Sequence, residues 1–135
     1  KVRWYGRGPQ ASYPDRKSGY RMGQYDSSVD EMYEPYLIPE DHGVRMDWRW
    51  VEFTSDTGKG LRFAMDEPFS FNAYPFTTGN LTKSVYQYQL KKSGNVTVNL
   101  SYAESGVGDT SLGILRGYRA PVTVYERTVF ISACR

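Results

Sequence analysis

Fifteen carboxylate side chains are the residues of this 135-residue chain best able to perform acid–base or nucleophilic chemistry. Chemistry by a carboxylate pair, such as retaining hydrolysis of an acetal, needs two of them about 5–5.5 Å apart on a rigid scaffold. Three sets are close in sequence, all beside turn-forming or breaker residues: Glu40 with Asp41, Asp66 with Glu67, and Glu31 with Glu34. Carboxylates in such loops are normally solvated. We therefore predict no catalytic residue in this chain.

Other catalytic and metal-binding side chains are scarce. His42 is the only histidine and lies in the polar loop 39–43, and no G-x-S-x-G nucleophile pattern accompanies it, so a Ser-His-Asp arrangement is not predicted. Cys134 is the only cysteine, which excludes an internal disulfide and a zinc site built on His and Cys. An oxygen-ligand site at Asp109, Thr110 or backbone carbonyls stays open. We expect no cofactor and no metal in this chain.

The segment 106–113 is rich in glycine. It contains neither the G-x-G-x-x-G dinucleotide fingerprint nor a phosphate loop. We interpret it as a sharp connection in which Gly106, Gly108 and Gly113 adopt dihedrals that other residues resist. Such a loop can project side chains toward a neighbouring domain.

Aromatic residues make up 16% of the chain and are candidates for stacking on sugar rings. The segment 44–50 alternates strictly and places Trp48 and Trp50 on the same face as Val44 and Met46, with Arg45, Asp47 and Arg49 on the other. This favours core positions for both tryptophans over a sugar platform. Trp4 and Tyr20 remain candidates for an exposed platform.

The elements that must position these residues are short strands. After 44–50 the apolar phase slips at Val51, which predicts a bulge or a change of buried face there, and the turn 55–60 leads into a strand at 61–65. Further strands are predicted at 69–74, 85–90, 96–102, 121–125 and 128–131, with one helical turn near Thr78. The prediction is one all-β domain over residues 1–135, an antiparallel β-sandwich or barrel.

Charge and hydropathy exclude several classes of partner. Seventeen basic and fifteen acidic residues give a net charge of +2, without the basic patch expected of a nucleic-acid or anionic-lipid partner. No stretch approaches the roughly 18 apolar residues of a membrane span. The chain begins abruptly in strand-like residues 2–5, so we expect a piece of a longer polypeptide.

The segment Trp4-Tyr-Gly-Arg-Gly-Pro-Gln-Ala-Ser-Tyr-Pro-Asp-Arg16 resembles a long, specific motif of the C-terminal domain of β-galactosidases of glycoside hydrolase family two. The resemblance continues in order through Tyr33 to Arg45, Phe69 to Ala73, Leu81 onward, and Gly106 to Ser111. It covers nearly the whole chain.

The resemblance implies the second half of an antiparallel supersandwich, similar to the galactose mutarotase-like fold, at the C-terminal end of a β-galactosidase. In that family the sandwich packs against a TIM barrel holding two catalytic glutamates, and neither glutamate has a counterpart here. The parent family commonly uses Mg²⁺ and Na⁺. We therefore expect the remaining domains and a galactoside as partners, possible homo-oligomers, and a bacterial cytoplasm or periplasm as the compartment.

The resemblance also implies a substrate rim. In the family the loop matching 106–113 reaches toward the active site and offers a tryptophan to the aglycone side. Here Leu112 takes that position, so the rim residues expected are Leu112, Asp109 and Ser111. Leucine lacks the flat π face that stacks on a sugar, which predicts an altered substrate preference. Where many relatives carry a histidine after the helical turn, this chain has Tyr86 or Tyr88.

Two other functions stay open. A free-standing carbohydrate-binding sandwich would use exposed aromatic residues such as Trp4 or Tyr20, and a mutarotase-like enzyme would need an acid and a base around His42. Half of a sandwich also leaves backbone groups unpaired and an apolar face open. The isolated chain is therefore expected to self-associate or to rearrange into a smaller sandwich.

Overall fold

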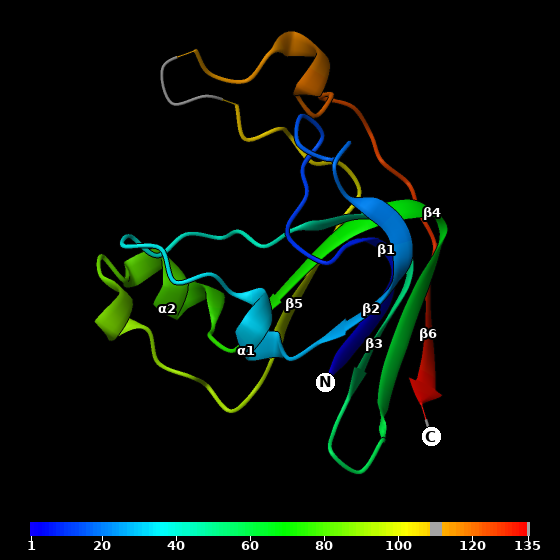
Figure 1. The fold of residues 1–135 in the computed structure, drawn as a ribbon, viewed down its shortest axis with the longest axis vertical. Coiled ribbons are helices and arrows are strands. Elements are labelled where there is room, and N and C mark those ends of the chain that lie inside the picture. Colours follow the sequence, from blue (N-terminus) through cyan, green and yellow to red (C-terminus); the bar gives the residue numbers. More distant parts are fainter. Residues whose placement is uncertain (109–111, 135) are drawn as a thin grey trace.

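The computed structural model describes residues 1–108 and 112–134, which form mainly antiparallel strands (Figure 1). Six strands lie in this part of the chain: β1 (Val2–Gly8), β2 (Arg21–Ser27), β3 (Arg45–Thr54), β4 (Gly60–Tyr74), β5 (Thr97–Ser101) and β6 (Val129–Cys134). Two short α-helices, α1 (Val29–Met32) and α2 (Thr78–Lys83), and two 3₁₀ turns, η1 (Gln87–Gln89) and η2 (Arg116–Tyr118), connect them. The prediction of an all-β, antiparallel, sandwich-like fold is confirmed.

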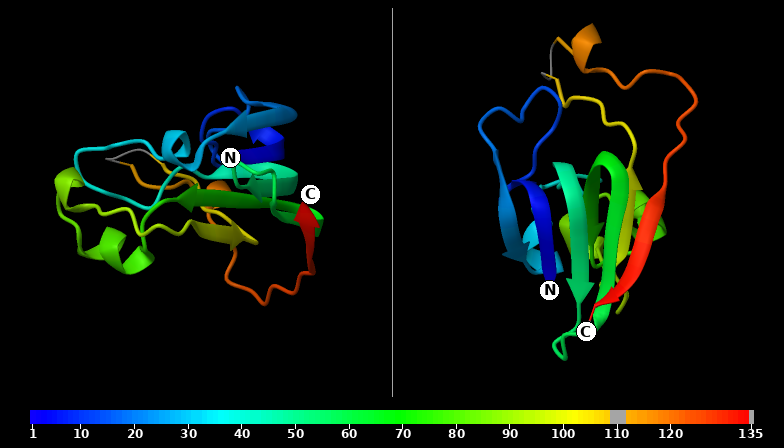
Figure 2. Two further views of the ribbon diagram at one scale, coloured as in Figure 1. Left: turned by 90° about the horizontal axis from the view of Figure 1, so that it is seen from below. Right: turned by 90° about the vertical axis from the view of Figure 1, so that its right-hand side faces the viewer.

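One curved sheet carries the strands in the order β2-β1-β3-β4-β5, and β6 also pairs with β4. The long β4 serves both ladders, because β6 pairs with its residues 60–65 and β5 with its residues 70–74. Between the two ladders stands Pro68, which has no N–H to donate to a partner strand. The sheet curls around this bent strand, as Figure 2 shows.

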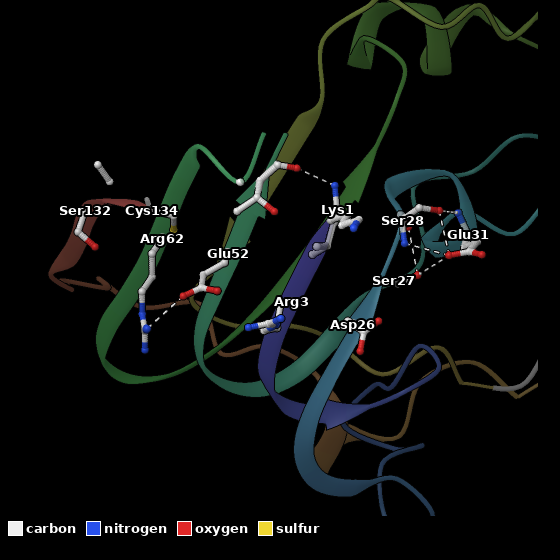
Figure 3. Close-up of a pocket in the computed structure, with 14 residues that line it drawn as sticks. Lys1, Arg3, Asp26, Ser27, Ser28, Glu31, Glu52, Arg62, Ser132 and Cys134 are labelled. Carbon is white, nitrogen blue, oxygen red and sulfur yellow. Dashed lines mark hydrogen bonds and ion pairs between the residues drawn. The ribbon is translucent and has the colours of Figure 1, made fainter. Parts of the chain in front are cut away.

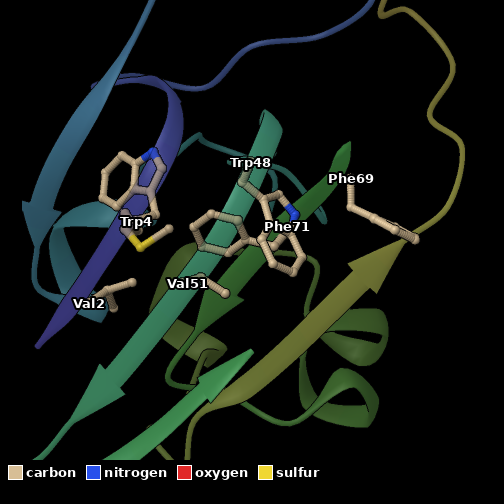
Figure 4. Close-up of a cluster of buried hydrophobic side chains, with 7 residues drawn as sticks. Val2, Trp4, Trp48, Val51, Phe69 and Phe71 are labelled. Carbon is tan, nitrogen blue, oxygen red and sulfur yellow. The ribbon is translucent and has the colours of Figure 1, made fainter. Parts of the chain in front are cut away.

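The main core covers one face of the sheet. Along β1 the burial alternates, so that Val2 and Trp4 point inward while Arg3 and Tyr5 point to solvent. The Trp4 and Trp48 rings both meet the edge of Phe71, with ring centroids 5.9 Å apart in each pair. The fully assembled cluster consists of Val2, Trp4, Met32, Trp48, Val51, Phe69 and Phe71 (Figure 4). Each such side chain contributes about 1.5–3 kcal/mol when it leaves water.

Helix α1 delivers Met32 to this core. Its N-terminus is closed by a capping box, in which Ser28 accepts from the Glu31 N–H and Glu31 accepts from the Ser28 N–H. A second cluster lies beneath α2 and contains Tyr33, Tyr74, Phe76 and Leu81. The helical turn predicted near Thr78 is confirmed as α2, which is capped by Thr77.

The strict alternation predicted along β3 is wrong. The register of β3 against β4 shifts between Arg45 and Trp48 and again between Trp48 and Trp50, and Asp47 has φ +55°. The irregularity therefore precedes Val51 instead of occurring there. Trp48 is buried as predicted, but Arg45 turns inward too.

Trp50, predicted to be a core residue, lies on the opposite face. Its ring is half-buried, and the guanidinium of Arg62 stacks over it at 4.4 Å from the ring centroid. Each shift in β3 moves the buried position by one residue, so Arg45, Trp48 and Val51 face the core at a spacing of three and the period-two expectation fails.

Other differences are local. The strand predicted at 85–90 is the 3₁₀ turn η1, and the strand predicted at 121–125 is an extended segment without a ladder. The strand predicted at 128–131 is confirmed as β6, while β2 was not predicted because its sequence is polar. No helix in the described residues has the length and apolar character needed to cross a membrane.

Candidate functional site

The glycine-rich loop and the motif that precedes β2 meet at one end of the molecule, which we call the loop end (Figure 1). The motif forms a tight turn from Tyr13 to Arg16. The Arg16 N–H donates to the Tyr13 carbonyl at 2.8 Å, and the Tyr13 N–H donates back at 3.4 Å. Pro14 and Asp15 stand at the tip of this turn, where proline's fixed φ is favourable.

The turn is anchored to β3 and the segment before it. Ser12 is fully buried, donates its N–H to the Val44 carbonyl at 2.8 Å, and accepts the Met46 N–H on its Oγ at 3.1 Å. The Tyr13 hydroxyl accepts the Gly43 N–H at 3.2 Å, and burial raises the pKa of this phenol.

Asp15 connects this turn to the glycine-rich loop. Its Oδ1 accepts the Val107 N–H at 3.1 Å, and its Oδ2 accepts the Gly108 N–H at 2.8 Å. Desolvation raises the pKa of Asp15, but the hydrogen bonds from Gly108 and Val107 together outweigh it and hold that pKa below its usual value. The ionised carboxylate is therefore the form that holds the loop.

The glycines of the loop are required by this geometry. A Cβ on Gly106 would lie 2.4 Å from the Asp15 Cγ, so any larger residue would push the carboxylate away. Gly108 and Gly113 both have φ +67°, and a Cβ on Gly108 would lie 2.8 Å from the Gly113 carbonyl carbon. The predicted left-handed conformations are confirmed for Gly108 and Gly113, whereas Gly106 is needed for close approach.

Further hydrogen bonds brace the two arms of the loop against each other. The Gly106 N–H donates to the Tyr118 carbonyl at 2.7 Å, and the Ala120 N–H donates to the Ser105 Oγ at 2.9 Å. The loop base is thus held from both sides, by Asp15 and by the η2 segment.

Among the predicted rim residues, Leu112 is described and Asp109 and Ser111 lie outside the described residues. The Leu112 side chain is 83% exposed, so it packs on little of this chain and is available to another molecule or domain. The open oxygen-ligand hypothesis at Asp109 and Thr110 also falls on residues 109–111.

Four of the six carboxylates singled out above are engaged in local contacts. Glu31 caps α1, and the Ser28 backbone and side-chain hydrogen bonds lower its pKa. Asp41 accepts the Asn72 amide at 2.6 Å, Glu34 accepts the Tyr36 hydroxyl at 2.8 Å, and Glu67 pairs with Arg127 at 2.9 Å. These partners give the four carboxylates structural roles. Within residues 1–108 and 112–134, no three His, Cys, Asp or Glu side chains gather as a metal cage.

His42 is enclosed by aromatic rings. The Tyr33 and Tyr36 ring centroids lie 4.6 Å and 4.8 Å from the imidazole. Burial lowers the pKa of His42, against the opposing effects of Glu34, Asp41 and Glu40. This packing makes His42 a structural residue of the loop, with a cavity of about 80 Å³ beside it that Tyr13, Arg16 and Tyr36 also line.

The structure changes the interpretation of three aromatic residues. Trp4 is fully buried, so the expectation that it forms an exposed sugar platform is wrong. Tyr86 and Tyr88 are exposed and stack on each other, with ring centroids 5.7 Å apart and planes 9° apart. Sequence spacing gave no sign of this pair, because residues 85–90 were interpreted as a strand, in which Tyr86 and Tyr88 lie on one face but do not stack.

A large polar groove lies far from the loop end, on the side of the sheet where the two termini are found (Figure 3). Its volume is about 1160 Å³. Asp26, Arg3, Glu52 and Arg62 stand opposite one another on four adjacent strands, and Arg62 pairs with Glu52 at 3.1 Å. Because the charges alternate in sign, the groove does not favour a ligand of either charge.

The sequence is similar to parts of known proteins. The family model described as beta galactosidase small chain matches residues 1–131. A beta-galactosidase of Priestia megaterium is 38% identical over 105 residues, which are 78% of this chain and 10% of the relative. Beta-galactosidase BgaC of Bifidobacterium adolescentis is 33% identical over 110 residues, and a beta-galactosidase of Pseudoalteromonas haloplanktis is 33% identical over 108 residues, with coverages of 79% and 80% of this chain and 10% of each relative. The chain thus spans about a tenth of the length of the curated relatives that it matches.

Proposed function

We propose, since the chain belongs to the β-galactosidase small-chain family, that it is a non-catalytic C-terminal part of a β-galactosidase and shapes the rim of that enzyme's active site. The parent enzyme would hydrolyse terminal β-D-galactosides with catalytic residues from another domain. The observation that carries this proposal is the exposed Leu112 beside a loop base that is fixed from two sides. A fixed loop can present an apolar side chain to a ligand at low entropic cost.

The carboxylates support the non-catalytic part of the proposal. Four of them have local partners. Glu31 caps α1 and Glu34 accepts the Tyr36 hydroxyl, while Asp41 accepts the Asn72 amide and Glu67 pairs with Arg127. A retaining glycosidase needs two carboxylates that face one bound sugar. In the proposed arrangement the other domains supply that pair, and a TIM barrel is the fold that we expect to hold it.

Support of the assembly is the second part of the proposed role. The outer part of β4 and the strand β6 expose Leu61 and Ile131 on the face of the sheet that carries the core, and Phe130 on the opposite face. Leu61 lies opposite Ala133 and Ile131 lies opposite Phe63 in the ladder, so apolar side chains continue beyond the covered core. Such a surface suits packing against another part of the parent polypeptide.

The rim role is tested by Leu112→Trp in the full-length parent enzyme. A tryptophan would add a flat π face, so the ratio of kcat/KM for lactose to that for an aryl β-galactoside is expected to change by about threefold or more. Leu112→Ile serves as the matched control, because it keeps the volume and the apolar character. An unchanged ratio in the tryptophan variant would overturn the rim role.

The non-catalytic role is tested on the purified 135-residue chain. It is expected to leave a chromogenic β-galactoside intact at every pH. Turnover that copurifies with the chain and survives removal of contaminating enzymes would overturn the proposal.

A second candidate function is a free-standing carbohydrate-binding module, and the stacked Tyr86 and Tyr88 pair favours it. Their side chains are 50% and 80% exposed, and exposed aromatic faces suit sugar rings. Calorimetry with galactosides separates the two functions. Saturable binding by the isolated chain that disappears in Tyr86→Ala would favour the binding module.

A further inference from the structure

The Asp15 carboxylate joins its own turn to Val107 and Gly108, which lie 92 and 93 residues later in the sequence. Each carboxylate oxygen takes one of two consecutive backbone N–H groups, from Val107 and Gly108. One hydrogen bond fixes a distance, whereas two parallel bonds to one planar group also fix an orientation. The loop base is therefore held in both position and direction.

The turn that carries Asp15 is itself anchored to the body of the molecule. Pro14 restricts the tip, and paired backbone bonds between Tyr13 and Arg16 close it. Behind the tip, the buried Ser12 is bonded to both Val44 and Met46. A displacement of the turn that carries Asp15 would thus require the segment entering β3 to move.

The contact also lies close to Leu112. Gly106 is buried against the carboxylate, with no space for a Cβ, and the Gly113 backbone returns to contact Gly108. Leu112 immediately precedes Gly113, so the place at which Leu112 leaves the loop base depends on where Gly108 is held.

From this geometry we propose that Asp15 is a positioning residue for substrate specificity: it fixes residues 106–108 and, through the contact between Gly108 and Gly113, the place of Leu112 at the active-site rim. This inference rests on the rim role proposed above. Asp15 touches no substrate and acts through two backbone amides. The part of the substrate affected would be the aglycone of a β-galactoside, because in the proposed arrangement the galactosyl group binds among the catalytic residues of another domain.

The test compares Asp15→Ala and Asp15→Asn in the full-length parent enzyme. Alanine removes both acceptor oxygens. Asparagine keeps one acceptor oxygen and should therefore retain part of the positioning of Val107 and Gly108. The kcat/KM ratio of lactose to o-nitrophenyl β-galactoside is expected to shift by about tenfold in Asp15→Ala and by less in Asp15→Asn. Inhibition by free galactose, which has no aglycone, should stay within about twofold of the parent.

The matched control is Asp56→Asn, in the exposed turn between β3 and β4. It removes the same charge at a site that no described contact links to the loop. Its lactose to aryl galactoside ratio should equal that of the parent. A similar shift in the control would overturn the inference, because the effect would then come from net charge.

Amide hydrogen exchange over residues 105–108 separates the possible failures. Unchanged exchange in Asp15→Ala would show that the carboxylate does not hold the loop, which overturns the inference. Faster exchange with an unchanged substrate ratio would overturn the link to specificity. An unchanged ratio in Leu112→Ala would instead overturn the proposed rim role, whatever Asp15 does. Faster exchange together with a shifted ratio, partly restored in Asp15→Asn, would support the inference.

Discussion

Gly43 stands in a left-handed conformation at the entry to β3, with φ +84°. A Cβ at this position would lie 2.9 Å from the Met32 carbonyl oxygen and 3.2 Å from Nη1 of Arg45. The buried Arg45 guanidinium donates to the carbonyls of both Met32 and Gly43. A substitution here therefore disturbs the backbone and the partners of a buried cation together.

We predict that Gly43→Ala lowers the free energy of unfolding by about 2 kcal/mol or more, through strain and displaced hydrogen bonds. Gly79→Ala is the matched control, since it lies within α2 and nothing stands within 4 Å of its Cβ. It should raise the free energy by about 0.5–1 kcal/mol. Urea unfolding followed by tryptophan fluorescence measures both, and changes of the same sign would contradict this explanation.

His42 adds a pH dependence at the residue scale. Desolvation lowers its pKa below the ordinary 6.5, so the unfolded chain binds a proton more readily than the folded one. The neutral His42 side chain therefore makes its full contribution to the free energy of unfolding above pH 6.5. This contribution is lost as the pH falls toward the pKa of His42 in the folded chain.

The measurement is the urea midpoint between pH 7.5 and 5. His42→Gln cannot titrate in this range, so its midpoint should fall less steeply with acidification than that of the parent chain. Parallel slopes would show that other groups cause the acid sensitivity.

Among the elements, β3 contains Asp47, a non-glycine residue in the left-handed conformation. Asp47 has φ +55°, and its carboxylate pairs with Arg7 and Lys17. The left-handed residue allows the register shift, and the ion pairs fix its direction.

Asp47→Asn retains tolerance of the left-handed conformation and loses the charge, so it should cost about 0.5–1 kcal/mol. Asp47→Ala loses both and should cost about 1 kcal/mol more. Melting temperatures in low and in high salt separate the two contributions. Equal melting temperatures for the two variants would show that the backbone conformation carries no cost.

Period-two patterns predicted those strands that keep one face buried, and failed where another interaction determined the local structure. The segments 61–65 and 69–74 were predicted because apolar residues recur at every second position in each of them, as in Leu61 and Phe63 and in Phe69 and Phe71. β3 defeated the pattern, since its alternation continues in the sequence across shifts that each move the buried position by one residue. η1 was mistaken for a strand because Gln89 closes the turn by accepting the Val85 and Tyr86 N–H groups, a contact that composition does not reveal.

The candidate site was predictable only in part for a similar reason. The need for special glycines between 106 and 113 follows from their number, and the position of Leu112 follows from a motif. Asp15 was visible as part of the motif, but its contact with Val107 and Gly108 joins segments that no local pattern relates.

At the scale of the whole molecule, the sheet is covered on one face only over its middle. The core beneath α1 is closed, while the apolar row continues outward onto β4 and β6, where Leu61 and Ile131 are 48% and 61% exposed. β6 also pairs with β4 alone among the described strands, so its other edge can accept a further strand.

We predict that the purified chain self-associates in a concentration-dependent manner, because exposed apolar side chains and an open edge favour pairing between copies. Ile131→Lys places a charge on this edge and should shift the apparent mass from light scattering toward the monomer. Val85→Lys is the matched control, since Val85 is 58% exposed but lies away from β6. If the unsubstituted 135-residue chain stays monomeric at millimolar concentration, the prediction is contradicted. Equal effects of both lysine substitutions would show that the contact between copies lies elsewhere. In the full-length parent enzyme we expect another part of the polypeptide to cover this surface. There Ile131→Lys should impair assembly more than Val85→Lys.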